Sequence, residues 1–446
     1  MISFAYCLLA SLAVLTKAYV VPYQYGTTKF WPLPSEDAFY QVAPDFHAYA
    51  PGDIYDYRPT PFPLGAFGES LESIQENYQI SYRTTDSNNN PTLTVMTVLV
   101  PQNPDYSKVL SFQIAEDTAT VDCAPSFGLQ LIPGVDDKLR SGATQLQVWL
   151  IQAALAKGWI VVVPDFQGPK GAYAAGKLAG YAVLDGIRAT LKSGFLTGIK
   201  EDAKVVMWGY SGGGGVTQVA ASYQPTYAPE LKIAGAAYGG VAGSGADPLT
   251  LNKSPDAGLL PASMLGLATM HPDIEQLLDH SIKPEFKELF FSPRKQCLES
   301  NLDAFRNKDV IGMFKNGTFE AVAAAVAKAL VEENQGMTTP TIPMFLYQAV
   351  EDTISPIETV DALVNEICDA GAVVDYLKNE APSVNHQNYG LLGAPAALDW
   401  MKAIMADERE QSACRTAVYN VTTFDPDFLA LYPKKIRQGL LGLVPK

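Results

Sequence analysis

The chain has 446 residues, of which 48% are hydrophobic, and a formal net charge of -15. It is long enough for one large α/β domain with an insertion or for two domains, and either arrangement buries a sizeable core. The negative charge and the scarcity of clustered Lys and Arg argue against nucleic acid or an anionic membrane surface as the main partner, because both bind to a concentrated positive face.

The first 18 residues have the pattern of a signal peptide. Residues 2–15 are nearly all apolar or small, and Thr16 and Ala18 supply small residues at the two positions that determine cleavage. The stretch is too short for a membrane span, and no later stretch reaches the roughly 18 to 20 uninterrupted apolar residues that a span requires. We therefore expect a secreted, extracellular chain without transmembrane anchoring.

Cysteines and glycosylation motifs agree with secretion. Once Cys7 leaves with the signal peptide, four cysteines remain, namely Cys123, Cys297, Cys368 and Cys414. An even number in an oxidising compartment predicts two disulfides. The sequence permits three pairings, although the short separation of the last two cysteines favours a local bridge. Candidate glycosylation sites of the type Asn-x-Ser/Thr begin at Asn252, Asn316 and Asn420.

The first part of the mature chain, residues 19–243, has the pattern of an α/β core. Residues 19 to about 65 are rich in Pro and Tyr and lack periodicity, which predicts an extended arm on the domain surface. β-rich runs then flank a turn sequence and predict an antiparallel hairpin of residues 78–84 and 92–100. Alternating buried strands and helices follow, with strands at 109–114 and 159–163 and helices around 144–156 and 175–192. This alternation predicts a mostly parallel central sheet with helices on both faces.

A mostly helical stretch at residues 244–335 predicts an inserted cap or lid, because strand patterns resume only after it. The second part of the core is then residues 336–446, which include a C-terminal tail. There we expect a strand at Met344–Ala349, a helix with Ser355 as N-cap and Pro356 as first residue, a last strand at 373–377 and a closing helix at 391–405.

The most informative motif is Gly-x-Ser-x-Gly at residues 209–213. It follows an apolar run at 205–208 and precedes apolar residues at helical spacing, as strand–turn–helix requires. Such a nucleophile elbow strains the backbone of Ser211 and raises its hydroxyl above the sheet, while the flanking glycines let strand and helix approach closely. The alternative is an ordinary glycine-rich turn between a strand and a helix.

A serine hydroxyl becomes a strong nucleophile only when an imidazole takes its proton and a carboxylate orients that imidazole. In α/β-hydrolases the acid and then the histidine follow the serine along the chain. The four histidines are His47, His271, His280 and His386. His386 alone lies downstream in the loop after the last predicted strand, and it is the candidate base.

Asp352 is the candidate acid, because it lies three residues beyond the end of the strand at 344–349. The adjacent Glu351 is the alternative, whereas Asp361 and Asp369 fall in the following helix.

The oxyanion of acyl transfer requires N–H donors, one from Gly212 and one from the loop after the strand at 109–114. That loop offers Glu116, Asp117 or Thr118, and we expect a structural role for Asp165.

These motifs resemble the fungal secretory lipase family, the lipase A group of the α/β-hydrolase superfamily. The matching stretches span about residues 30–410 and are Glu116-Asp117, Cys123 to Ser126, Asp165 to Gly168, Leu184 to Arg188, Gly209 to Gly213, Asp352 before Pro356, and His386. The resemblance implies an α/β-hydrolase fold with a helical cap and action on triacylglycerols. It also implies a triad of Ser211, Asp352 and His386, oxyanion donors Asp117 and Gly212, and the disulfides Cys123–Cys297 and Cys368–Cys414.

The sequence therefore predicts a serine lipase that needs no metal and no organic cofactor. We expect a monomer whose partner is a lipid or ester substrate at a lipid–water interface. Apolar residues of the cap would line an acyl channel, face lipid or simply form the core of the cap: Leu259, Leu260, Met264, Leu265, Leu267 and Met270. The rival functions are an esterase or acyltransferase that acts on smaller esters with the same triad, and a non-catalytic hydrolase-like binding protein.

Overall fold

The computed structural model describes residues 31–42, 46–241, 248–409, 412–432 and 434–441. The signal peptide predicted at residues 1–18 and the boundary predicted between residues 243 and 244 lie outside these ranges. Residues Pro32–Lys446 form one compact unit, which contains every element described below. Among the helices of these described ranges, none combines the length and the apolar composition that a membrane span requires.

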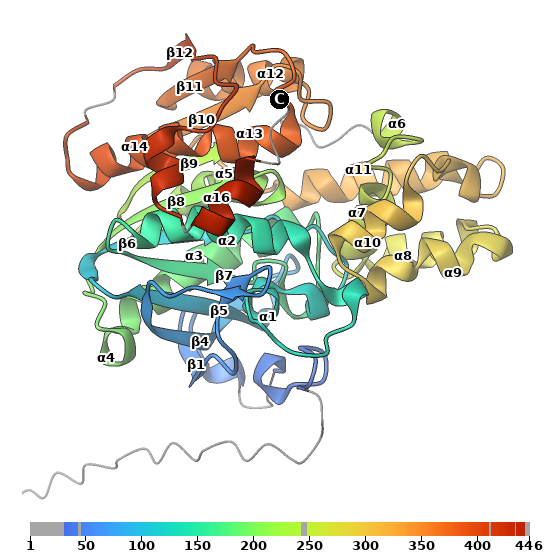
Figure 1. Cartoon of the computed structure of the whole chain (residues 1–446). Helices are drawn as coiled ribbons and strands as arrows, with labels where there is room; N and C mark the ends of the chain where they lie inside the picture. Colours follow the sequence, from blue (N-terminus) through green and yellow to red (C-terminus); the bar gives the residue numbers. More distant parts are fainter. Residues whose placement is uncertain (1–30, 43–45, 242–247, 410–411, 433, 442–446) are drawn as a thin grey trace, which may run out of the picture. The chain divides into compact units, whose positions relative to one another are not determined.

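A ten-stranded sheet organises this unit, with the strand order β1-β4-β5-β7-β6-β8-β9-β10-β11-β12 (Figure 1). The strands are β1 (Ile54–Pro59), β4 (Ile74–Thr85), β5 (Pro91–Pro101), β6 (Asp105–Gln113), β7 (Trp159–Pro164), β8 (Lys204–Tyr210), β9 (Ile233–Gly239), β10 (Met344–Ala349), β11 (Val374–Asn379) and β12 (Arg415–Val418). All neighbouring pairs from β7 to β12 in this order are parallel, whereas β1–β4, β4–β5 and β5–β7 are antiparallel. A separate small sheet pairs β2 (Gly65–Ala66) with β3 (Glu69–Ser70).

Helices cover both faces of the large sheet, which confirms the predicted fold class. One face packs against α2 (Gly142–Leu155), α13 (His386–Leu392) and α14 (Ala394–Met405), and the other against α3 (Gly176–Lys192), α5 (Gly212–Tyr227) and α12 (Ile357–Asp369). Along β8, Val206 and Trp208 face the first layer while Val205 and Met207 face the second. Because both faces are buried, the parallel strands appear in the sequence as continuous apolar runs.

Between β9 and β10 the chain forms a helical insertion. Its α-helices are α6 (Pro248–Leu251), α7 (Leu259–Ala268), α8 (Pro272–Ser281), α9 (Lys287–Phe290), α10 (Leu298–Phe305) and α11 (Phe319–Glu333) (Figure 1). Most residues of one hydrophobic cluster belong to the insertion, and Ala119, Ala172, Ala175 and Leu178 join it from the core. That cluster contains Leu260, Met264, Leu265, Leu267 and Met270, with Leu259 packed against it, so these side chains form the core of the insertion.

The expectation that residues 373–377 form the last strand is wrong, because β12 continues the sheet in parallel with β11. All four residues of β12 are exposed, so no apolar pattern reveals this edge strand. β9 also went unpredicted, because its sequence of mostly Ala and Gly has low strand propensity. In the predicted arm, β1 pairs with β4 and extends the sheet at its other edge.

Candidate active site

Ser211 occupies the turn between β8 and α5, with φ 57° and ψ -129°. A positive φ is rare for a residue with a side chain and marks backbone strain held by the surrounding structure. Its N–H donates to the carbonyl of Gly239 at the end of β9 at 2.9 Å. A Cβ atom on Gly209 would lie 2.3 Å from the carbonyl oxygen of Gly213, so the first glycine of the motif cannot carry a side chain. Strand, turn and helix thus fix Ser211 at the carboxyl edge of the parallel strands.

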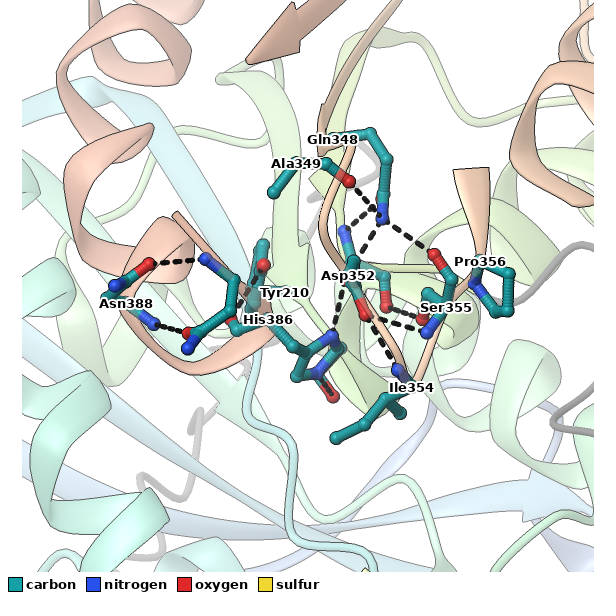
Figure 2. A network of polar contacts seen from close by, with 12 residues as sticks. Tyr210, Gln348, Ala349, Asp352, Ile354, Ser355, Pro356, His386 and Asn388 are labelled. Carbon is teal, nitrogen blue, oxygen red and sulfur yellow. Dashed lines mark hydrogen bonds and ion pairs between the residues drawn. The ribbon is translucent and has the colours of Figure 1, made fainter. Parts of the chain in front are cut away.

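His386 is the first residue of α13, not a loop residue as expected from the sequence. Asn385 caps this helix through reciprocal hydrogen bonds with Asn388, which fixes where the helix begins. The imidazole Nε2 lies 2.7 Å from the Oγ atom of Ser211. The hydroxyl of Tyr210 donates to the backbone carbonyl of His386 at 2.9 Å, so the residue before the serine also holds the histidine (Figure 2).

Asp352 follows β10 and is only 4% exposed. Its Oδ2 atom lies 2.7 Å from Nδ1 of His386. Its Oδ1 atom accepts the backbone N–H groups of Ile354 at 2.9 Å and Ser355 at 2.7 Å (Figure 2). The structure therefore brings Ser211, His386 and Asp352 into one hydrogen-bonded chain, the arrangement that nucleophilic serine chemistry requires.

The rejected candidates have other partners. Glu351 is exposed, and its carboxylate accepts the N–H of Ser383 at 3.3 Å. Asp361, which lies in α12, forms an ion pair with Lys378 of β11. Nε2 of His271 lies 2.8 Å from the carboxylate of Glu333, and Nδ1 of His280 lies 2.7 Å from the carbonyl of Gln276.

Asp117 lies against Gly212, in the loop that follows β6. A Cβ atom on Gly212 would be 1.9 Å from Oδ1 of Asp117, and this Oδ1 is buried without a hydrogen-bond partner among the described residues. Burial raises the pKa of Asp117 to about 6, with an opposing effect of His386 and a reinforcing one of Glu299. Of the other two loop candidates, Thr118 donates its hydroxyl to the carbonyl of Thr120, while Glu116 is buried beside Asp165.

Asp165 belongs to a buried polar network behind this loop. Its carboxylate accepts both the N–H and the hydroxyl of Ser126, and that hydroxyl lies 2.7 Å from the phenol oxygen of Tyr40 in the N-terminal arm. Burial raises the pKa of Asp165 to about 7. Burial, Asp165 and Asp117 together raise the pKa of Glu116 well above its ordinary value. Asp165 thus connects the arm to the segment that follows the loop of Asp117.

We expect Asp165→Asn to weaken the pH dependence of stability. A carboxyl whose pKa is raised in the folded state favours folding while protonated, and this advantage is lost as the pH rises from about 4 to 7. The difference between 3.8 and about 7 corresponds to about 4 kcal/mol as an upper estimate. Thermal unfolding from pH 4 to 8 should show a shallower decline of Tm for Asp165→Asn than for the wild type. Asp137→Asn, at a fully exposed carboxylate, should keep the wild-type decline; equal slopes for all three proteins would contradict the prediction.

Two disulfides connect distant segments, with the pairings that the family resemblance implies. Cys123–Cys297 joins the segment after the Asp117 loop to the N-cap of α10, with the Cα atoms 5.6 Å apart. Cys368–Cys414 joins the end of α12 to the segment before β12, with a Cα separation of 6.1 Å. Near the first bridge, the carboxylate of Glu299 accepts the N–H of Ala143 at the N-terminus of α2. The helical insertion is therefore fixed to the core beside the candidate site.

The three glycosylation candidates differ in their surroundings. Asn316 is exposed in the turn before α11. The Asn252 side chain donates to Asp309 at 3.0 Å and accepts the N–H of Ile311 at 3.2 Å. Asn420 is exposed, and its Oδ1 accepts the N–H of Glu380 at 2.7 Å. All three remain predictions.

Sequence reasoning missed two residues that contact the acid. The N-cap of α12 is Pro356 and not Ser355 as expected from the sequence. The hydroxyl of Ser355 instead donates to the carbonyl of Gly240 at 2.8 Å. Gln348 is fully buried in β10, and its amide donates to Asp352 at 2.9 Å. A glutamine inside the apolar strand 344–349 is the signal that could have identified it, because a buried amide requires partners.

Comparisons with known proteins show to which family the chain belongs. The family profile described as Secretory lipase matches residues 135–412. Lipase A of Arthroderma benhamiae is 39% identical over 93% of this chain and 88% of that protein, and Lipase 4 of Candida albicans is 35% identical over 89% and 88%. The crystal structure of Candida antarctica lipase A superimposes with a TM-score of 0.79 at 28% identity, covering 93% of this chain and 96% of that one. The chain therefore belongs to the secretory lipase family.

Proposed function

We propose that this secretory lipase hydrolyses triacylglycerols through a covalent acyl-enzyme formed on Ser211. The observation that carries the proposal is the chain of two 2.7 Å contacts from Ser211 through His386 to Asp352. Ser211 attacks the ester carbonyl while Nε2 of His386 takes the hydroxyl proton and then gives it to the departing alcohol. Water repeats these steps and releases the fatty acid. Asp352 keeps the proton of His386 on Nδ1 and stabilises the imidazolium.

We propose Gly212 and Asp117 as the donors to the oxyanion. The backbone N–H of Gly212 lies at the N-terminus of α5, where the helix dipole favours negative charge. Asp117 lies directly against Gly212, and with a pKa near 6 its carboxyl is protonated in mildly acidic solution. A protonated carboxyl has one O–H to donate.

Asp117 variants test this assignment. Asp117→Ala removes the donor, and kcat should fall by about 10²–10³. Asp117→Asn supplies an N–H donor at any pH, and asparagine tolerates the φ of 45° at this position. We therefore expect kcat of Asp117→Asn, relative to the wild type, to rise between pH 5 and 8 as the wild-type carboxyl ionises. Initial rates on a soluble p-nitrophenyl ester measure this ratio. Wild-type activity in Asp117→Ala would contradict a role of the side chain.

The organisation of the chain is part of the proposal. Residues 1–18 act as a signal peptide, and residues 244–335 form a cap between two parts of the core, 19–243 and 336–446. The concentration of one hydrophobic cluster in the insertion supports this division, and Cys123–Cys297 attaches the insertion to the core. The enzyme acts as a secreted monomer on lipid at a lipid–water interface.

A graded series of esters separates this function from its rivals. Emulsified long-chain triacylglycerols and soluble short-chain esters are compared with the wild type and with Ser211→Ala. A rise in rate where a long-chain ester passes its solubility limit supports a lipase, and activity on short soluble esters alone supports an esterase. A folded protein that fluorophosphonate does not label supports a binding protein.

A further inference from the structure

Gln348 is the penultimate residue of β10 and is completely buried. A buried amide costs free energy unless its donors and its acceptor find partners. We infer that Gln348 is a positioning residue of the triad. It holds the carboxylate of Asp352 in a fixed position relative to the turn that carries Ser211. The inference rests on the proposed function of Ser211, His386 and Asp352.

The amide nitrogen of Gln348 holds the acid. Nε2 donates to Oδ2 of Asp352 at 2.9 Å and to the carbonyl of Ser355 at 2.9 Å (Figure 2). Oδ2 is the same oxygen that faces Nδ1 of His386. With two backbone N–H groups on Oδ1, the carboxylate has four donors. Rotation of the carboxylate would break several of these bonds together, so Gln348 fixes the direction in which Oδ2 meets the imidazole.

The amide oxygen of Gln348 holds the nucleophile turn. Oε1 accepts the backbone N–H of Gly240 at 3.1 Å, and the preceding carbonyl, that of Gly239, accepts the N–H of Ser211 at 2.9 Å. Gly240 has a φ of 61°, and a Cβ atom there would lie 3.0 Å from Cε1 of His386. Gln348 therefore bonds to two segments of the site. One is the loop that carries Asp352, and the other is the backbone at Gly240, which lies next to Ser211 and His386.

This placement has a consequence for the chemistry. When His386 takes the serine proton, the new positive charge is stabilised by Oδ2 of Asp352, and this interaction depends on the orientation of the carboxylate. The amide of Gln348 is buried and bonded within the protein through both its nitrogen and its oxygen, so it is not free to bind substrate. Its loss should therefore lower kcat and leave KM nearly unchanged.

Gln348→Met tests the inference, because methionine has a similar length and no amide. The matched control is Gln224→Met at the end of α5, where a buried amide donates to the carbonyls of Ala228 and Leu231 at 3.1 Å each. On a soluble p-nitrophenyl ester we expect Gln348→Met to lower kcat about tenfold to one-hundredfold, with KM within about twofold of the wild type. Gln224→Met should lower Tm and keep kcat.

The pH profile of kcat/KM is a second measurement, and a purely structural role of Gln348 would leave this profile unchanged. Without the amide, the carboxylate of Asp352 can turn away from Nδ1 and stabilise the imidazolium less, so the acidic limb of the profile should move to lower pH in Gln348→Met. Among the described residues, the carboxylates that act on the imidazole include those of Asp352, Asp117 and Asp256. None of them is altered in Gln348→Met or in Gln224→Met.

Gln348→Glu decides the question if the methionine variant does not fold. A protonated glutamic acid still donates to Oδ2 of Asp352, whereas an ionised one repels it, so kcat relative to the wild type should fall as the pH rises. Wild-type kcat and pH profile in either folded variant would overturn the inference. Ser211→Ala separates the two proposals: if it abolishes activity while the Gln348 variants match the wild type, only the role of Gln348 fails, and if it stays active, the proposed function fails.

Discussion

Replacement of Ser211 with alanine is expected to lower kcat for triacylglycerol hydrolysis by about 10⁶-fold, because loss of a serine nucleophile removes nearly the whole effect of the triad. The oxyanion donors and substrate binding remain, so a residual rate of about 10³ over the reaction in water is expected. KM should change little, since the hydroxyl makes its decisive interaction in the transition state. Initial rates of fatty acid release from emulsified triolein measure the loss.

Ser222→Ala is a matched control for this loss. Ser222 lies on α5, three turns beyond Ser211, is 3% exposed and donates its hydroxyl to the carbonyl of Gln218 at 3.0 Å. A fluorophosphonate should label the wild type and Ser222→Ala with equal speed and leave Ser211→Ala unmodified. A persistent adduct on folded Ser211→Ala would show that another residue is the nucleophile.

The elbow and its partners could be predicted because their signals are local or ordered along the chain. An apolar strand, two glycines around a serine and a following helix all lie within residues 205–223. The acid and the histidine follow from chain order, since strand ends of a parallel sheet meet at one edge. Asp352 and His386 were identified in this way, although His386 begins a helix that the sequence did not indicate.

The supporting residues could not be predicted, because their roles depend on contacts between distant segments. Ser355 before Pro356 has the local pattern of a helix cap, yet its hydroxyl bonds to Gly240, 115 residues away. Gln348 likewise meets Gly240 across 108 residues. Tertiary hydrogen bonds to buried polar groups override the structure that a local sequence pattern favours. Such differences from the local pattern concentrate at functional sites. The edge strand β12 is a different case, because exposed residues leave no periodic signal.

Asp352→Asn should lower kcat by about 10⁴-fold while leaving the fold in place, because it changes the tautomer of the catalytic imidazole. The N–H groups of Ile354 and Ser355 both donate to Oδ1, so the oxygen of the asparagine must take that position. Its NH₂ group then takes the position of Oδ2 and faces Nδ1 of His386. Nδ1 has to accept this hydrogen bond, which moves the imidazole proton to Nε2.

An imidazole with its proton on Nε2 donates to Ser211 and cannot take the serine proton, and this accounts for the expected loss in kcat. The same NH₂ group also faces the amide N–H of Gln348, so we expect Tm to fall modestly as well. Asp361→Asn is the matched control, since Asp361 bonds to Tyr376 and Lys378 and has no contact with the imidazole. Steady-state rates on a soluble ester, together with thermal unfolding, compare the two variants. If Asp352→Asn retained kcat within tenfold of the wild type, Asp352 could not be the residue that sets the tautomer of His386.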